Sequence, residues 1–253
     1  MPRLDKLLVD TGRFETRSRA RDAIARGTVM VNGTPATKAG LAVAKDAQIA
    51  VKDPAASYVS RAALKLIAAL DQFDFDPGGR TVIDIGASTG GFSQVMLERG
   101  ASHIFAVDVG SGQLADRLRN DQRITNLENI NARHLNITHL KSGQSPLDSP
   151  SISAIVSDVS FISLRLALPP ALELAQPGAF AALLVKPQFE VGREHIGKGG
   201  IVDDPARAEA VASDLESWLE TQNGWRTVGL VPSPISGSDG NREFLLGGIK
   251  DKV

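Results

Sequence analysis

The hydrophobic pattern of the first fifty residues predicts a small module of short helices and strands. Leucines recur at helical spacing near the start of the chain, and Thr16 has the side chain of an N-cap for a second helix that Gly27 would end. The pair Asn32-Gly33 follows an apolar run and favours a tight turn. Together these signals predict an α+β domain over residues 1–52. The expected elements are helices over 3–10 and 17–26 and strands over 29–31 and 48–51.

A different pattern follows a break at residues 53–57, where Pro54 and small residues interrupt the periodicity and indicate a linker. From residue 58 to residue 253, apolar runs of strand length alternate with amphipathic stretches of helix length. Such alternation is typical of an α/β domain with a mostly parallel sheet and helices on both faces. The expected strands are 81–85, 103–109, 152–158, 179–186, 226–231 and 243–247, and the expected helices are 60–72 with Ser60 as its cap, 90–99, 114–119 and 205–222.

Composition limits the chemistry that either part can perform. The chain of 253 residues contains no cysteine, which excludes disulfides, thiolate ligation of zinc and cysteine nucleophiles. We expect a cytoplasmic protein without membrane contact, because neither a signal-peptide core nor an apolar run of about 20 residues is present. The first 55 residues hold ten Lys/Arg against six Asp/Glu, and the remainder holds 18 against 23. A basic module joined to an acidic one favours a polyanionic partner for the first.

Arginine is concentrated on the second predicted helix. Its apolar stripe would pack inward while the flanking guanidinium groups grip phosphate oxygens, although a solvated helix could carry the same arginines. The module resembles the RNA-binding fold named after the fourth small-subunit ribosomal protein, in the pattern Arg3-Leu4-Asp5-x-x-Leu8, Ser18-x-Ala20 and Ile24-x-x-Gly27-x-Val29-x-Val31-Asn32-Gly33. We therefore expect RNA contacts from Arg3, Arg17, Arg19, Arg21 and Arg26.

A glycine-rich turn joins the first predicted strand of the larger domain to the helix that follows. Glycines let the backbone turn sharply and approach a ligand closely, and ligands of open α/β sheets bind where strands end. The next strand ends at Asp108, whose carboxylate could accept hydrogen bonds from both hydroxyls of a ribose. The G-x-G-x-x-G of nicotinamide enzymes is absent, and the turn is closer to the methyltransferase pattern. The residues expected to bind S-adenosylmethionine are Asp84, Gly86, Ala87, Ser88, Thr89, Gly90, Gly91 and Asp108.

Four charged residues lie at positions that an ordinary solvated surface does not account for in every case. They are Lys65, Asp158, Lys186 and Glu243. Asp158 and Lys186 follow apolar strands, so they emerge at the ligand edge of the sheet. A ribose 2′-hydroxyl must lose its proton as it attacks, and a lysine near a second lysine and a sulfonium could accept it as a neutral amine. Two carboxylates would orient the lysines, and no metal is expected.

These four residues resemble the tetrad of FtsJ-like 2′-O-ribose methyltransferases, and the whole chain resembles the hemolysin A (TlyA) family. The motifs that carry the resemblance are Tyr58-Val59-Ser60-Arg61, Gly86-Ala87-Ser88-Thr89-Gly90-Gly91-Phe92, Val107-Asp108-Val109-Gly110, Lys186-Pro187-Gln188-Phe189-Glu190, Gly197-Lys198-Gly199-Gly200 and Pro232-Ser233-Pro234-Ile235-x-Gly237-x-x-Gly240-Asn241. The resemblance implies a Rossmann-like methyltransferase domain with S-adenosylmethionine as cofactor. It also implies 2′-O-methylation of cytidine in ribosomal RNA or a ribosomal subunit.

Two other functions are compatible with parts of this pattern. The family name suggests a cytolytic, membrane-active protein, but such a protein needs a spanning or amphipathic membrane segment that the sequence lacks. The chain could instead be an RNA-binding protein without catalysis. Occupation of all four tetrad positions argues against that alternative.

Overall fold

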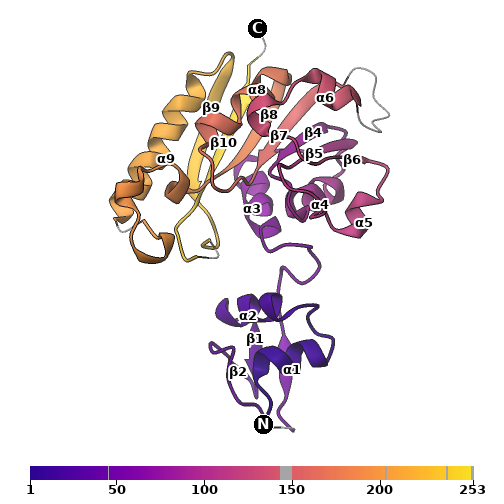
Figure 1. The fold of residues 1–253 in the computed structure, drawn as a ribbon, viewed down its shortest axis with the longest axis vertical. Coiled ribbons are helices and arrows are strands. Elements are labelled where there is room, and N and C mark those ends of the chain that lie inside the picture. Colours follow the sequence, from indigo (N-terminus) through magenta and orange to yellow (C-terminus); the bar gives the residue numbers. More distant parts are fainter. Residues whose placement is uncertain (45, 143–149, 203, 238, 252–253) are drawn as a thin grey trace. The chain divides into compact units, whose positions relative to one another are not determined.

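Two compact units, Met1–Ser57 and Tyr58–Val253, make up the computed structural model shown in Figure 1. The structure describes residues 1–44, 46–142, 150–202, 204–237 and 239–251. The last two residues of the predicted methyltransferase domain, 252–253, lie outside this description. Residues 53–57, expected to be a linker, are grouped with the first unit.

The first unit packs two helices against a small antiparallel sheet of order β2-β1-β3. The hydroxyl of Thr16 accepts a hydrogen bond from the backbone N–H of Arg19, which confirms the predicted N-cap. Asn32 and Gly33 both have positive φ, 49° and 79°, as the predicted tight turn requires. Leu4, Leu8 and other apolar side chains form a separate core. The elements are α1 (Leu4–Asp10), α2 (Arg17–Ala25), β1 (Val29–Val31), β2 (Thr34–Pro35) and β3 (Ile49–Val51).

In the described part of the second unit, seven strands form one sheet of order β6-β5-β4-β7-β8-β10-β9. The first five in this order are parallel, whereas β10 runs antiparallel to both of its neighbours. The mostly parallel sheet is therefore confirmed, and β6 is the strand that the hydrophobic pattern did not predict. The strands are β4 (Thr81–Ile85), β5 (His103–Val107), β6 (Ile124–Leu127), β7 (Ile152–Ser157), β8 (Ala175–Val185), β9 (Trp225–Pro232) and β10 (Phe244–Lys250).

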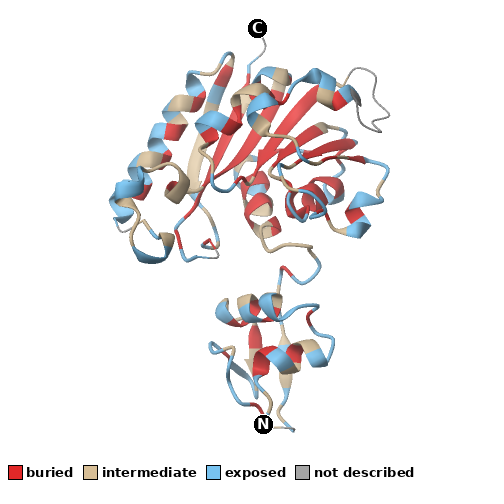
Figure 2. Cartoon of the chain, in the orientation of Figure 1, coloured by how far each residue is buried: buried red, intermediate tan, exposed pale blue. Residues whose placement is uncertain are grey.

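Helices cover both faces of this sheet, and each face has its own buried core, coloured red in Figure 2. The predicted cap of α3 is wrong, because the helix begins at Ala63 and the Ser60 hydroxyl accepts from the Ala62 N–H in the preceding turn. One face carries α3 (Ala63–Phe73), α4 (Gly91–Glu98) and α5 (Asp116–Arg119), and the other carries α6 (Ile137–Ser142), α7 (Leu164–Ala167), α8 (Pro169–Leu174) and α9 (Pro205–Glu220). No helix among the described residues is long and apolar enough to cross a membrane.

The strand order reverses between β4 and β7. From β4 the chain moves outward through β5 to β6, and it then returns to the other side of β4 and moves outward through β7 to β8. The carboxyl ends of these parallel strands share one edge, and the reversal leaves a crevice there. This edge is where the topology places a ligand site.

Candidate active site

The register of the sheet brings the predicted tetrad together at that edge. Val185 of β8 and Phe244 of β10 are the last paired residues of these two strands at this edge. Lys186 and Glu243 therefore lie opposite one another, one position further on. Asp158 directly follows β7, the other neighbour of β8. The fourth residue, Lys65, comes from α3, which packs against β8 and β10.

In this cluster each lysine contacts a carboxylate. Nζ of Lys65 donates to Oε2 of Glu243, and the two side chains are 6% and 2% exposed. Nζ of Lys186 lies 2.6 Å from Oδ1 of Asp158 and donates to Oγ of Ser160 at 2.8 Å. The Lys186 and Asp158 side chains are 12% and 17% exposed. The first pair is thus sealed in the protein, and the second is open enough to meet a substrate.

The electrostatic coupling extends across all four residues. Burial raises the pKa of Glu243 above its ordinary value, while attraction to Lys65 and Lys186 opposes the shift and repulsion from Asp158 adds to it. The sequence predicts a neutral lysine through repulsion between two lysines, but the structure places a carboxylate against each lysine. The chemistry is therefore better described by two lysine–carboxylate pairs than by one isolated amine.

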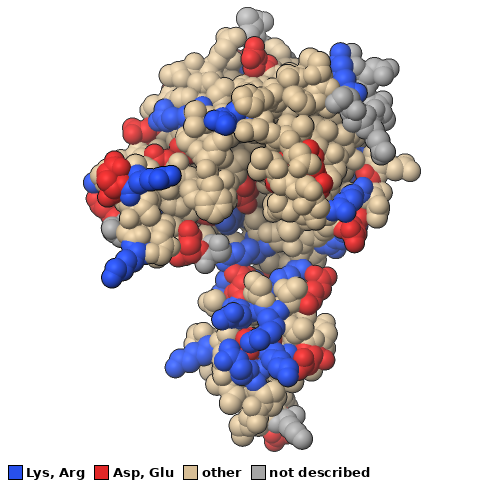
Figure 3. Space-filling view, in the orientation of Figure 1, with Lys and Arg blue, Asp and Glu red and all other residues tan. Residues whose placement is uncertain are grey.

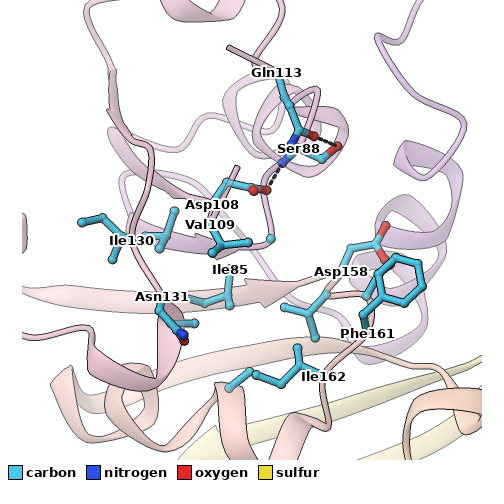
Figure 4. A pocket seen from close by; sticks show the side chains of 16 residues that line it. Ile85, Ser88, Asp108, Val109, Gln113, Ile130, Asn131, Asp158, Phe161 and Ile162 are labelled. Carbon is cyan, nitrogen blue, oxygen red and sulfur yellow. Dashed lines mark hydrogen bonds between the residues drawn. The ribbon is translucent and has the colours of Figure 1, made fainter. Parts of the chain in front are cut away.

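Two adjoining cavities lead to the Lys186–Asp158 pair. The larger, of about 530 Å³, extends from Asp108 at the end of β5 to Asp158, and Figure 4 shows its lining side chains. The smaller, of about 130 Å³, reaches Lys186. The two cavities share four lining residues, Gly86, Ser88, Asp158 and Ser160. A volume of several hundred Å³ is typical of a cofactor site.

The glycine-rich turn after β4 forms the wall between these cavities and the sheet. Gly86 has a φ of +80°, and a Cβ added there would lie 3.0 Å from the backbone oxygen of Asp158. Only glycine fits this close approach without strain. The carboxylate of Asp108 accepts from the N–H of Ser88 at 2.8 Å and from the N–H of Gly110 at 2.7 Å. Figure 4 shows the first of these bonds beside the contact between Ser88 and Gln113.

Six of the eight predicted cofactor residues line one of the two cavities: Gly86, Ala87, Ser88, Thr89, Gly91 and Asp108. Gly90 lines neither, and a Cβ there would meet Leu118 at 2.4 Å. Asp84 also lines neither cavity and is fully buried behind the turn. Its Oδ2 accepts from the Ser93 hydroxyl at 2.7 Å, in the first turn of α4. The structure thus brings Asp84 to the helix N-terminus rather than to the cavity surface.

Sequence reasoning did not identify three further residues of the site. Ser160 contacts Lys186, and the Phe161 ring lies at the larger cavity, 90% exposed and 5.1 Å from the Phe189 ring. Glu190 accepts from the hydroxyl of Ser163 at 2.6 Å and thereby ties the loop after β8 to the loop after β7. Phe161 was the available signal, because an aromatic side chain just beyond a strand end, at the ligand edge of a sheet, can contact a ligand.

The five arginines predicted to bind RNA differ in how freely they can reach a ligand. Arg3 and Arg17 both bond to Asp5 and are 54% exposed, and Arg21 is exposed with no partner in the described part of the chain. Arg19 pairs with Glu15 and is 28% exposed. Arg26 is only 14% exposed, because it makes a two-pronged pair with Asp53 and also bonds to Asp22. Its contacts indicate that Arg26 fixes the end of α2 rather than facing a ligand.

Comparison with known proteins connects this geometry to a family. The model of the FtsJ-like methyltransferase family matches residues 58–250, and the S4 domain model matches residues 2–49. A 16S/23S rRNA (cytidine-2′-O)-methyltransferase, TlyA of Mycobacterium tuberculosis, is 42% identical over 96% of this chain and 88% of its own length. The chain belongs to the hemolysin A (TlyA) family of FtsJ-like methyltransferases.

Other members of this family match over nearly the whole chain. Hemolysin A of Brachyspira hyodysenteriae is 37% identical over 96% of this chain and 98% of its own. A solved structure from Streptococcus thermophilus, described as a candidate hemolysin, is 39% identical and has a TM-score of 0.74, covering 99% of this chain and 88% of that one. The match therefore includes the S4 domain as well as the methyltransferase domain.

Within the described residues, no group of three or more His, Asp or Glu side chains could hold a metal ion.

Proposed function

We propose that the protein transfers a methyl group from S-adenosylmethionine to a ribose 2′-hydroxyl of ribosomal RNA, with cytidine as the target nucleoside. The observation that carries the proposal is the Lys186–Asp158 pair at the end of a cavity that begins at Asp108. The (cytidine-2′-O)-methyltransferase named in the family supports the choice of acceptor. A ribosomal substrate would place the protein in the cytoplasm.

The residues along the cavity fit the proposed cofactor. Asp108 lies where a carboxylate could accept the ribose hydroxyls, and the turn at Gly86–Gly91 would hold the methionine part. Gly86 lines both cavities, and its lack of a side chain lets the turn pass close to the backbone of Asp158. When bound, the cofactor supplies an electrophilic methyl group. This chain then has to present the acceptor oxygen and remove its proton.

Lys186 is the residue proposed to act on that proton. Its Nζ would bind the 2′-hydroxyl and take the proton as the oxygen gains the methyl group. Asp158 and Ser160 already hold Nζ, at 2.6 Å and 2.8 Å, and so fix its direction. Lys186 would act in its neutral form, because only an amine with a free lone pair can accept the proton. The buried Lys65–Glu243 pair would keep the neighbouring charge balanced.

The target base would lie outside the cavity, against the exposed ring of Phe161. RNA-binding proteins commonly stack unpaired bases on aromatic side chains. Phe161 has a φ of +65°, which is unusual for a bulky residue, and the hydrogen bonds of the adjoining loop hold it there. The S4 domain would bind another part of the same RNA through its exposed arginines.

The test is methyl transfer from labelled cofactor to purified 16S and 23S rRNA and to intact ribosomal subunits. A 2′-O-methyl group removes the nucleophile that alkali uses to cleave RNA, so the modified linkage should resist alkaline hydrolysis. Sequencing the alkali-resistant position would identify the nucleoside. Label that is incorporated without alkali resistance would indicate methylation of a base, and the proposed acceptor would then be wrong.

A further inference from the structure

The Asp5 carboxylate joins two arginines that are far apart in the sequence. Nε and Nη2 of Arg3 donate to its two oxygens at 3.1 Å and 3.3 Å, and Nη2 of Arg17 donates to Oδ2 at 2.7 Å. Both guanidinium groups therefore reach the same oxygen. The N–H of Lys6 bonds to Oδ1, which fixes the carboxylate itself at the start of α1.

The exposure of the three side chains is unequal. Asp5 has no exposed side-chain surface, whereas Arg3 and Arg17 are each 54% exposed. A guanidinium carries more N–H donors than these bonds use, so each arginine keeps donors that point to solvent. The hydrogen bonds from Arg3 and Arg17 hold the pKa of Asp5 well below its usual range. The carboxylate is therefore charged whenever the arginines are in place.

This cluster differs from an ordinary surface salt bridge in its charge. Two arginines and one carboxylate leave a net positive charge, and the negative member is covered. In Figure 3, Lys and Arg side chains gather on the visible face of the first unit over α1 and α2. A free arginine loses much rotamer freedom when it binds a ligand, but Asp5 has already restricted both of these.

We propose that Asp5 is a positioning residue for RNA binding, which holds the guanidinium groups of Arg3 and Arg17 as a fixed pair that takes two phosphate groups of one RNA backbone. This inference rests on the proposed function of the S4 domain. Arg26 supplies a contrast, because its partners Asp22 and Asp53 leave it only 14% exposed. Arg26, with two carboxylate partners, is therefore fixed within the fold. Arg3 and Arg17, which share one carboxylate, remain exposed to a ligand.

The decisive variant is Asp5→Asn, measured in the full chain by titration with purified 16S and 23S rRNA over a range of salt concentrations. Removal of a negative charge should strengthen binding if net charge alone matters. If Asp5 positions the arginines, binding should instead weaken about three- to tenfold, because two side chains must be ordered on binding. The matched control is Asp10→Asn, which makes the same charge change at an exposed residue at the end of the same helix.

Two further variants keep the outcome decisive. Replacing Arg3 and Arg17 together by lysine retains the charge but loses the forked geometry, so it should weaken binding. Hydrogen exchange of α1 shows whether Asp5→Asn folds, and the lysine variant tests the inference even if it does not. Replacing both by alanine should lower the salt slope of log K by about 0.7–0.9 per lost phosphate contact. Binding by Asp5→Asn as tight as by Asp10→Asn, or full affinity of the lysine variant, would overturn the inference. Unchanged affinity and slope in the alanine variant would instead remove this surface from the proposed RNA-binding function.

Discussion

Asp5 in the first unit and Asp84 in the second are carboxylates with no exposed surface, yet their surroundings have opposite effects. Asp5 bonds to two guanidinium groups, which hold its pKa well below the usual range. Asp84 has the Ser93 hydroxyl as its side-chain partner, and burial raises its pKa to about 7. Burial alone therefore does not determine whether an acidic residue is charged. The hydrogen-bonding partners of its carboxylate decide whether the charged form is stabilised.

The same contrast separates the two sites. In the first unit the carboxylate is covered and the cations face solvent, which suits an extended polyanion. In the second unit both members of the Lys65–Glu243 pair are buried, and Lys186 and Asp158 are nearly so. Charges held in this way can act only on a group that enters the cavity. The first arrangement therefore favours binding, and the second favours chemistry.

Replacement of Lys186 should produce the largest effect and test this division directly. Lys186→Ala should lower the single-turnover rate of methyl transfer by about 10²–10⁴-fold, because a positioned base typically contributes that much. Lys186→Arg should not restore the rate, since a guanidinium stays protonated. The affinity for rRNA should remain near that of the unaltered protein, because Lys186 is mostly buried and belongs to the second unit, whereas Arg3 and Arg17 belong to the first.

Lys141→Ala, at an exposed lysine of α6 that lines neither cavity, controls for the loss of a positive charge. Full activity of Lys186→Arg would show that a positive charge is sufficient at this position. The general-base role would then be wrong, although the site could still be the place of reaction.

The contrast between the two aspartates makes a prediction about stability. The pKa of Asp84 is raised from 3.8 to about 7, so the folded state binds its proton more tightly than the unfolded state does. The free energy of unfolding should therefore fall as pH rises from about 4 to about 7, by up to about 4 kcal/mol at 1.36 kcal/mol per pH unit. Asp84→Asn should remove that slope, because the amide resembles the protonated acid.

Urea unfolding at several pH values, followed by tryptophan fluorescence, measures this slope in the second unit. Trp218 and Trp225, the two tryptophans of the chain, both lie in that unit. An unaltered pH dependence in Asp84→Asn would show that Asp84 keeps its charge when buried, as Asp5 does, and the two aspartates would then not differ in this respect.

Much of the fold could be predicted from the sequence because hydrophobic periodicity and glycine-rich turns are local signals. The same signals predicted which strand ends come together at the candidate site, although Asp84 and Gly90 line neither cavity. The strand β6 was missed because Ile124–Leu127 is short and contains a polar Asn126. The partners of Lys186 and Arg26 were not predictable either. Whether an arginine is presented or fixed depends on carboxylates such as Asp53, which is 27 positions from Arg26 and reaches it only after folding.

Space matters as much as charge in the second site, and Gly86 tests this. Gly86→Val would place a branched side chain 3.0–3.1 Å from the backbone of Asp158 and Val159, at a φ of +80°. The close contact should push the Asp158 loop out of place beside the cavity, so the affinity for S-adenosylmethionine should fall about tenfold or more by calorimetry, which is about 1.4 kcal/mol or more of binding free energy. Gly33→Val, at a turn of the first unit with open space and a φ of +79°, is the matched control and should leave cofactor affinity unchanged. Equal losses in both variants would mean that backbone strain, not the cavity, is responsible.

Glu190 is a third carboxylate whose surroundings can be compared with those of Asp5 and Asp84. Its hydrogen-bond donors are neutral groups, and burial raises its pKa. It accepts from the Ser163 hydroxyl at 2.6 Å and from the Leu164 N–H at 2.7 Å, and so holds the loop that carries Asp158. Glu190→Ala should lower kcat about three- to tenfold, because the loop that carries Asp158 loses two of its hydrogen bonds and is positioned less firmly. A change of that size corresponds to about 0.6–1.4 kcal/mol in the barrier. Cofactor affinity should change little, because Glu190 lines neither cavity.

Glu190→Gln keeps an acceptor for the Leu164 N–H and should recover most of the lost rate, which a simple need for negative charge would not allow. The double variant with Ser163→Ala should lose less than the two single changes combined, because both act on the same hydrogen bond. Full additivity would show that Glu190 acts on the reaction by some other route. A loss in Glu190→Gln as large as in Glu190→Ala would show that the charge itself matters, and Glu190 would then belong with Asp5 as a carboxylate that works in its ionised form.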